Sequence, residues 1–241
     1  MGLIKSTVGD AVLTSLWVFS VSTLGTLTAI SAAALGLQAK SSSGLLLMTA
    51  LATVLMLIFS VVSSLLGGAS FNPATTVALY AAGLKPGVSL LSFAVRFPVQ
   101  AAAGAAGARA ISQVMPVQYR HMLRGPSLKV DLHTGAIAEG ALTFSICLVA
   151  LMIFTKGPKN LLIKVWLLAT ATVGLVVIGA GFTGPAMNPA NAFGWAYMNN
   201  WHNTWDQFYV YWICPFIGAA LAGRVYRFLF PVQKKPKQKA A

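Results

Sequence analysis

The sequence predicts an all-α membrane protein with six transmembrane helices and two re-entrant half-helices, arranged as inverted three-helix repeats. Composition, six long apolar stretches and a short motif that occurs twice lead to this fold class. Of 241 residues, 57% are hydrophobic and 9% are charged, with only four acidic side chains. A soluble domain carries about 25% charged residues. The composition therefore excludes an ordinary soluble enzyme and a disordered chain.

Each transmembrane helix needs about 20 mainly apolar residues. The first apolar stretch exceeds the apolar core of a signal peptide, so we expect it to be retained as a span. The stretches lie at about 11–36, 44–66, 87–112, 134–155, 161–183 and 207–230.

The basic residues predict the orientation of these spans, because six spans leave both termini on one side. Of the 17 lysines and arginines, 11 fall on the side of the termini and five on the other. The remaining residue, Arg96, lies within the third stretch, and we expect its side chain to snorkel to the cytoplasmic surface. The positive-inside rule then places both termini in the cytoplasm. We therefore interpret the net charge of +13 as a signal that orients the spans in the membrane, and we expect no nucleic-acid partner.

Two further apolar segments, 72–83 and 188–199, are too short to cross a bilayer. They open with Asn72-Pro73-Ala74 and Asn188-Pro189-Ala190. A single Asn-Pro is usually only a turn initiator. The functional interpretation is favoured here because both triplets follow glycine-containing stretches and occupy matching places in two halves of the chain.

The halves also match at the first span of each. Asp10 is followed four residues later by Thr14, and Glu139 by Thr143, so each acid–threonine pair lies on one helix face. We expect one transmembrane domain over 1–241, with repeats at about 10–112 and 134–230. Three spans per repeat invert the second half, and sites in such folds lie where half-helices meet. The two acids are either proton relays or, as we prefer, structural groups that hold backbone N–H groups.

The triplet has a physical consequence inside a bilayer. Asn is a favoured N-cap, and Pro is favoured at the first helical position. A helix that starts within the membrane leaves backbone N–H groups that only protein or a water-filled cavity can satisfy. Two such starts place positive dipole ends near the centre of a pore, which repels protons and cations.

With these motifs, the chain resembles the major intrinsic protein (aquaporin) family. The resemblance also rests on the run 211–215 (Tyr-Trp-Ile-Cys-Pro) before Gly218-Ala219-Ala220. The string 188–195 and the basic tail are similar to the plant small basic intrinsic proteins, most of all to their first subgroup. The resemblance implies a homotetramer in membrane lipid, with one pore for water or a small neutral solute in each protomer. It implies no catalytic residue, cofactor or metal.

The chain departs from the family pattern at the expected selectivity filter. Asn191 stands where most members have Arg, and Pro185 stands where a small residue or Cys is frequent. Val176 occupies the position on span five that is often His, and the position on span two is either Ala52 or Thr53. Such a filter is less polar and carries no cation. Asp10 also replaces the family's usual Glu while keeping the carboxylate.

The basic tail, residues 231–241, carries Lys237 and Lys239, three and five residues from the end. This spacing matches the dilysine pattern that coat retrieval machinery recognises in the endoplasmic reticulum, where the resembling subgroup usually resides. The alternatives are a topogenic charge cluster or a contact with anionic lipid. The leading hypothesis is a passive water channel of that membrane. Its rivals are a channel for glycerol, hydrogen peroxide or urea, and a non-conducting membrane protein.

Overall fold

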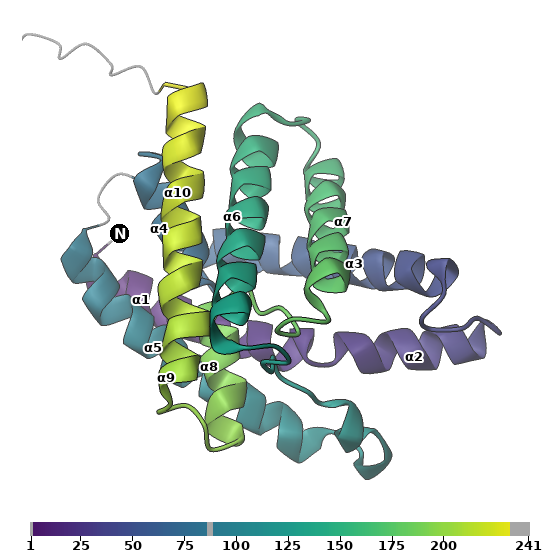
Figure 1. Cartoon of the computed structure of the whole chain (residues 1–241). Coiled ribbons are helices and arrows are strands. Elements are labelled where there is room, and N and C mark those ends of the chain that lie inside the picture. The colour runs from purple at the N-terminus through teal and green to yellow at the C-terminus, as the bar shows by residue number, and fades with distance from the viewer. Residues whose placement is uncertain (1, 86–88, 232–241) are drawn as a thin grey trace, which may run out of the picture.

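The computed structural model describes residues 2–85 and 89–231, and this part of the chain contains helices and no strand (Figure 1). This confirms the predicted all-helical membrane fold. The long helical segments are α1 (Leu3–Val21) with α2 (Leu24–Ala34), α3 (Ser42–Leu65), α5 (Leu90–Val114), α6 (Leu132–Lys156), α7 (Leu161–Gly179), and the sequence of α9 (Trp205–Phe208), the π-helical η2 (Tyr209–Ile213) and α10 (Cys214–Leu229). Two short helices, α4 (Pro73–Ala81) and α8 (Pro189–Met198), begin at the prolines of the two triplets, and a 3₁₀ turn, η1 (Val117–Met122), follows α5.

The segments differ in detail from the predicted spans. The first begins at Leu3 rather than residue 11, because about two additional helical turns precede the predicted apolar stretch. The last passes through a π-helical turn just before Pro215, which lacks the N–H that a regular helix would require there. Within the described residues, five segments are long and apolar enough to cross a membrane. Of the six long segments, α5 is the exception. It is long enough to cross a membrane, but it is less apolar because it is rich in Ala and Gly and contains two arginines.

Helix packing repeats between the two halves. In Figure 1, α6, α7 and α10 stand upright, while α1, α2 and α3 run across the view. Within each half the first and third long segments pack together, α1 on α5 and α6 on α10. Each half-helix packs on the last long helix of the other half, α8 on α5 and α4 on α10. The halves therefore interlock around the two half-helices.

Glycines allow the closest of these approaches. A Cβ at Gly104 would overlap the backbone carbonyl of Ala190 on α8, and one at Gly223 would overlap that of Ala78 on α4. Small residues let membrane helices approach to this extent. The half-helices are thus fixed against the long helices along one side.

Candidate functional site

Both half-helices begin at the predicted asparagines. The Asn72 Oδ1 accepts a hydrogen bond from the Ala74 amide at 2.9 Å, and the Asn188 Oδ1 accepts one from the Ala190 amide at 3.1 Å. A proline fills the first helical position in each case, where a missing N–H costs nothing. Local sequence therefore determines where each half-helix starts.

The two starts are bonded to each other. The Asn72 Nδ2 donates to the carbonyl of Met187 at 2.9 Å, and the Asn188 Nδ2 donates to the carbonyl of Phe71 at 3.0 Å. Each side chain thus caps its own helix and holds the residue before the other asparagine. A primary amide has two N–H groups, so one on each asparagine is left for a further acceptor. The positive ends of α4 and α8 meet at this junction.

Met187 has a strained backbone at the junction. Its φ of 46° is in the left-handed region, which is costly for a residue with a Cβ. Its amide donates to Glu139 Oε2 at 3.1 Å, and its carbonyl accepts from Asn72. Strain of this kind persists where the surrounding contacts over-determine a conformation.

Asp10 holds the approach to the first half-helix. Its Oδ1 accepts from the Ser70 amide at 2.8 Å, while its Oδ2 is 2.6 Å from the Nε of Arg96. The Ser70 carbonyl accepts from Gln100 at 2.7 Å. Asp10 is fully buried and Arg96 is only 4% exposed. The prediction that Arg96 snorkels to the surface is wrong, because its guanidinium instead neutralises a carboxylate inside the bundle.

A second cation lies near this ion pair. Lys85 follows α4, and burial lowers its pKa, as does the positive charge of Arg96, whereas Asp10 acts in the opposite direction. The first half of the chain therefore places two cations, from the segment after α4 and from α5, near the single buried carboxylate of α1.

Glu139 holds the approach to the second half-helix, and no cation of the described residues forms an ion pair with it. Its Oε1 accepts from the Thr183 hydroxyl and from the Ala186 amide, both at 2.8 Å, and its Oε2 accepts from Met187. The Thr183 carbonyl accepts from the Tyr211 hydroxyl at 3.2 Å. Glu139 is fully buried. Both carboxylates thus contact the segments that lead into the triplets.

The expected filter residues lie on four elements. Asn191 follows the second triplet, and its Oδ1 is buried with no hydrogen-bond partner among the described residues. Pro185 lies against Gly179 at the end of α7. Val176 is half-buried one turn before that point.

The two alternatives on α3 face different surroundings. Ala52 belongs to a buried cluster with Ala169 and Val173 of α7. Thr53 lines a small groove of about 310 Å³ between the same helices, together with Trp166 and Thr170. Ala52 thus faces the side of α7 that continues towards Val176. No hydrogen bond among the described residues joins either position to Asn191.

Gln100 and Tyr211 position the site, but this role was not predicted from the sequence, where Gln100 was not singled out and Tyr211 was noted only within the run 211–215. Gln100 lies one turn from Arg96 on α5, inside a run of small residues. An amide and a guanidinium on one face of an otherwise apolar helix are a signal for buried partners. Their partners on α1 and before α4 could not be read from spacing.

Comparison with known proteins agrees with this geometry. The family model described as major intrinsic protein matches residues 1–226. The chain belongs to the major intrinsic protein family. Aquaporin SIP1-1 of Zea mays is 55% identical over 240 residues, covering 99% of this chain and 98% of that protein. Aquaporin SIP1-1 of Arabidopsis thaliana is 49% identical over 243 residues and covers both chains fully.

The aquaglyceroporin of Plasmodium falciparum is similar in fold, with a TM-score of 0.67 at 16% identity, covering 93% of this chain and 96% of that one. As an aquaporin-family member of the small basic intrinsic type, the protein is a multi-pass membrane channel protein and not an enzyme.

Proposed function

We propose that the protein is a passive water channel whose pore centre is the junction of the two half-helices. The observation that carries the proposal is the reciprocal pair of hydrogen bonds from Asn72 to Met187 and from Asn188 to Phe71. It makes the two starts a single unit with two remaining amide N–H groups. A passing water would accept from these groups, while the two positive helix ends would repel protons and cations.

In this proposal Asp10 and Glu139 are structural. Their oxygens accept hydrogen bonds from backbone N–H groups of the segments that turn back inside the membrane. Without such acceptors these groups would be unsatisfied in a region with little water. The carboxylates would thereby keep both triplets in place without contacting water themselves.

The proposed outer filter combines Asn191, Pro185, Val176 and one of Ala52 or Thr53. Asn191 is neutral where most of the family has Arg, and this favours a second candidate function, passage of a small neutral solute such as glycerol, hydrogen peroxide or urea. Stopped-flow light scattering on proteoliposomes, with water and each solute in turn, separates the two functions. Flux no greater than that of empty vesicles would instead support a non-conducting role.

The Asn191→Arg variant tests the filter itself. Arginine adds five donors and a fixed charge, so the ratio of solute to water permeability should fall. The ratio is the readout because the added bulk could lower both fluxes. A ratio that stays constant or rises would place the constriction elsewhere, with Val176 the first position to examine.

We further propose a homotetramer in the endoplasmic reticulum, built from one channel domain with inverted repeats and both termini cytoplasmic. The basic tail supports the location, although Lys237 and Lys239 lie outside the described residues. Replacing both lysines by serine, with the C-terminus left free, should release the protein to later secretory compartments. Retention of this variant in the endoplasmic reticulum would overturn the role of the tail as a retrieval signal.

A further inference from the structure

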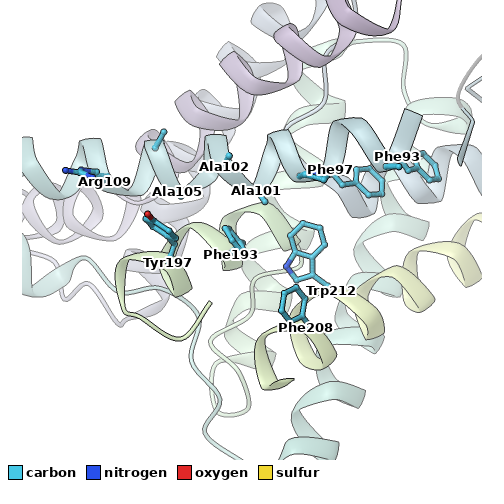
Figure 2. Close-up of a pocket in the computed structure, with 13 residues that line it drawn as sticks. Phe93, Phe97, Ala101, Ala102, Ala105, Arg109, Phe193, Tyr197, Phe208 and Trp212 are labelled. Atoms are coloured by element: carbon cyan, nitrogen blue, oxygen red, sulfur yellow. The ribbon is translucent and has the colours of Figure 1, made fainter. Parts of the chain in front are cut away.

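A long groove of about 860 Å³ runs along one flank of α5, and none of the residues of the two triplets lines it. Figure 2 shows α5 crossing the view with Arg109 near one end and Phe93 near the other. Tyr197, Phe193 and Trp212 follow one another alongside the helix. The groove is therefore elongated and apolar, lies on the flank of the protein, and is closed on one side by aromatic rings.

The floor of the groove is a row of small residues on α5. Ala94, Pro98, Ala102 and Ala106 recur every four residues, and Arg109 follows after three. This spacing keeps them on one helix face, and all five are exposed. At about 1.5 Å per residue the row extends for roughly 22 Å. A lipid acyl chain fits within this length, because the hydrocarbon core of a bilayer is about 30 Å thick and each of its two layers of chains spans roughly 15 Å.

Charge distinguishes one end of the groove from the other. Among the described residues that line the groove, Arg109 alone is charged. Among the described residues its guanidinium makes no hydrogen bond and no ion pair. An arginine near a helix end extends its head group towards the membrane interface. Guanidinium groups match the geometry of phosphate oxygens.

We propose that this groove binds a phospholipid with an anionic head group, with one acyl chain along α5 and the phosphate at Arg109. The apolar wall excludes a polar ligand from most of the groove. The unpaired cation at one end complements a phosphate, and it favours a head group that lacks a compensating ammonium. This site is independent of conduction through the half-helix junction.

Quenching of Trp212 fluorescence by lipids with brominated acyl chains tests the proposal directly. The protein is reconstituted in phosphatidylcholine vesicles that contain brominated phosphatidylglycerol or brominated phosphatidylcholine. The signal of Trp212 is the difference between the native protein and the Trp212→Phe variant. We expect the anionic lipid to quench this signal at about fivefold lower mole fraction, the ratio typical of one basic residue at a membrane surface.

Two variants and one control residue make the result decisive. Arg109→Gln should abolish the preference, whereas Arg109→Lys should keep it. Trp166 lies in the groove between α3 and α7, and none of the described residues that line this groove is a cation. The signal lost in Trp166→Phe should therefore be quenched equally by both lipids. Equal quenching of Trp212 by both lipids, or a preference that persists in Arg109→Gln, would overturn the proposal.

Blocking the groove gives an independent test. Ala102 is exposed on its floor, so Ala102→Phe fills the groove without entering the helix bundle. This variant should protect Trp212 from both brominated lipids and leave the oligomer size unchanged in size-exclusion chromatography. If native Trp212 is not quenched and Ala102→Phe reduces the oligomer size, a second copy of the chain covers the groove and no lipid binds there.

Discussion

The two halves of the channel hold their re-entrant segments with different chemistry. In the first half, the Asp10 carboxylate divides its oxygens between the Ser70 amide and Arg96. In the second half, both oxygens of the Glu139 carboxylate accept hydrogen bonds from hydroxyl and amide groups of the re-entrant segment. The first arrangement balances its charge with a cation, and the second disperses it over three hydrogen bonds.

This difference teaches that a repeated fold does not need repeated side-chain chemistry. The third long segment of each half donates to an approach carbonyl, with Gln100 bonded to Ser70 and Tyr211 bonded to Thr183. Backbone groups are therefore satisfied in both halves, as a membrane interior requires. The electrostatic solution is specific to each half, and substitutions should affect the halves to different extents.

Removing the cation should produce the largest loss of stability. Arg96→Met leaves Asp10 buried and unpaired, and breaking a buried ion pair on one side costs about 3–5 kcal/mol. Denaturant titration in mixed micelles measures the free energy of unfolding. The double variant with Asp10→Asn should be more stable than Arg96→Met alone, because no buried charge remains. Additive losses would show that the two side chains do not act as a pair.

Neutralising the carboxylate of the second half should cost less. Glu139→Gln keeps one acceptor oxygen but turns an NH₂ group towards donors of the re-entrant segment. With the NH₂ in the place of Oε2, the Met187 amide is left unsatisfied. One unsatisfied buried donor costs about 1–3 kcal/mol, measured in the same titration. A loss equal to that of Arg96→Met would contradict the contrast between the halves.

The close helix contacts should, by comparison, be equally sensitive in both halves. A Cβ at Gly107 would overlap the carbonyl of Ser15, and one at Gly218 would overlap that of Gly140. Gly107→Ala and Gly218→Ala should each cost about 1–3 kcal/mol through overpacking.

Gly25 and Gly174 are the matched controls, one in each half, because an added Cβ would meet no atom of the described residues within 4 Å beyond its own helix backbone and chain neighbours. Alanine at either position should be neutral or stabilising by up to about 1 kcal/mol. Losses at the controls as large as those at Gly107 and Gly218 would mean that helix packing is not their cause.

The smallest expected effect is a pH dependence at the start of α6. The Asp131 side chain accepts from the Thr134 amide, and hydrogen bonds from Thr134 lower the pKa of this carboxyl. The stabilisation is present above the ordinary Asp pKa of about 4 and is lost as pH falls through the lower folded value. The protection of the Thr134 amide, which is its exchange rate compared with that of an unprotected amide at the same pH, should therefore fall in acid.

Asp131→Asn is the control, because asparagine also caps a helix but does not titrate. The corresponding helix of the first half, α1, has Gly2 at its N-cap position and therefore no side-chain cap. Its first turn should show no such dependence. Equal acid sensitivity of native and Asp131→Asn protein would exclude the carboxylate as its source.

Local patterns predicted most of the fold, and non-local contacts account for what was missed. The Asn-Pro starts of α4 and α8 could be read because capping residues act on their own helix. Arg96 was misplaced because its partner lies 86 residues away on another helix, and only the packing of α5 on α1 brings them together. The junction likewise depends on bonds that join residues far apart in the chain.

The filter could be predicted less completely. Ala52 and Thr53 are neighbours in the sequence, yet one faces α7 in a buried cluster and the other lines a groove. Their difference follows from the rotation of α3 about its axis, which no short motif encodes. Asn191 and Pro185 were located by their distance from the triplet, and their contribution to selectivity stays a prediction.

The central claim, that both half-helix starts form one pore site, is tested most directly by water permeability of Asn72→Asp and Asn188→Asp in proteoliposomes. Aspartate caps a helix but cannot donate to water, and its charge offsets the dipoles. Each substitution should sharply reduce water flux or create a cation leak, measured at matched amounts of folded protein. Asn160→Asp, at the exposed start of α7, should change neither. Unchanged flux without a leak in both pore variants would contradict the account.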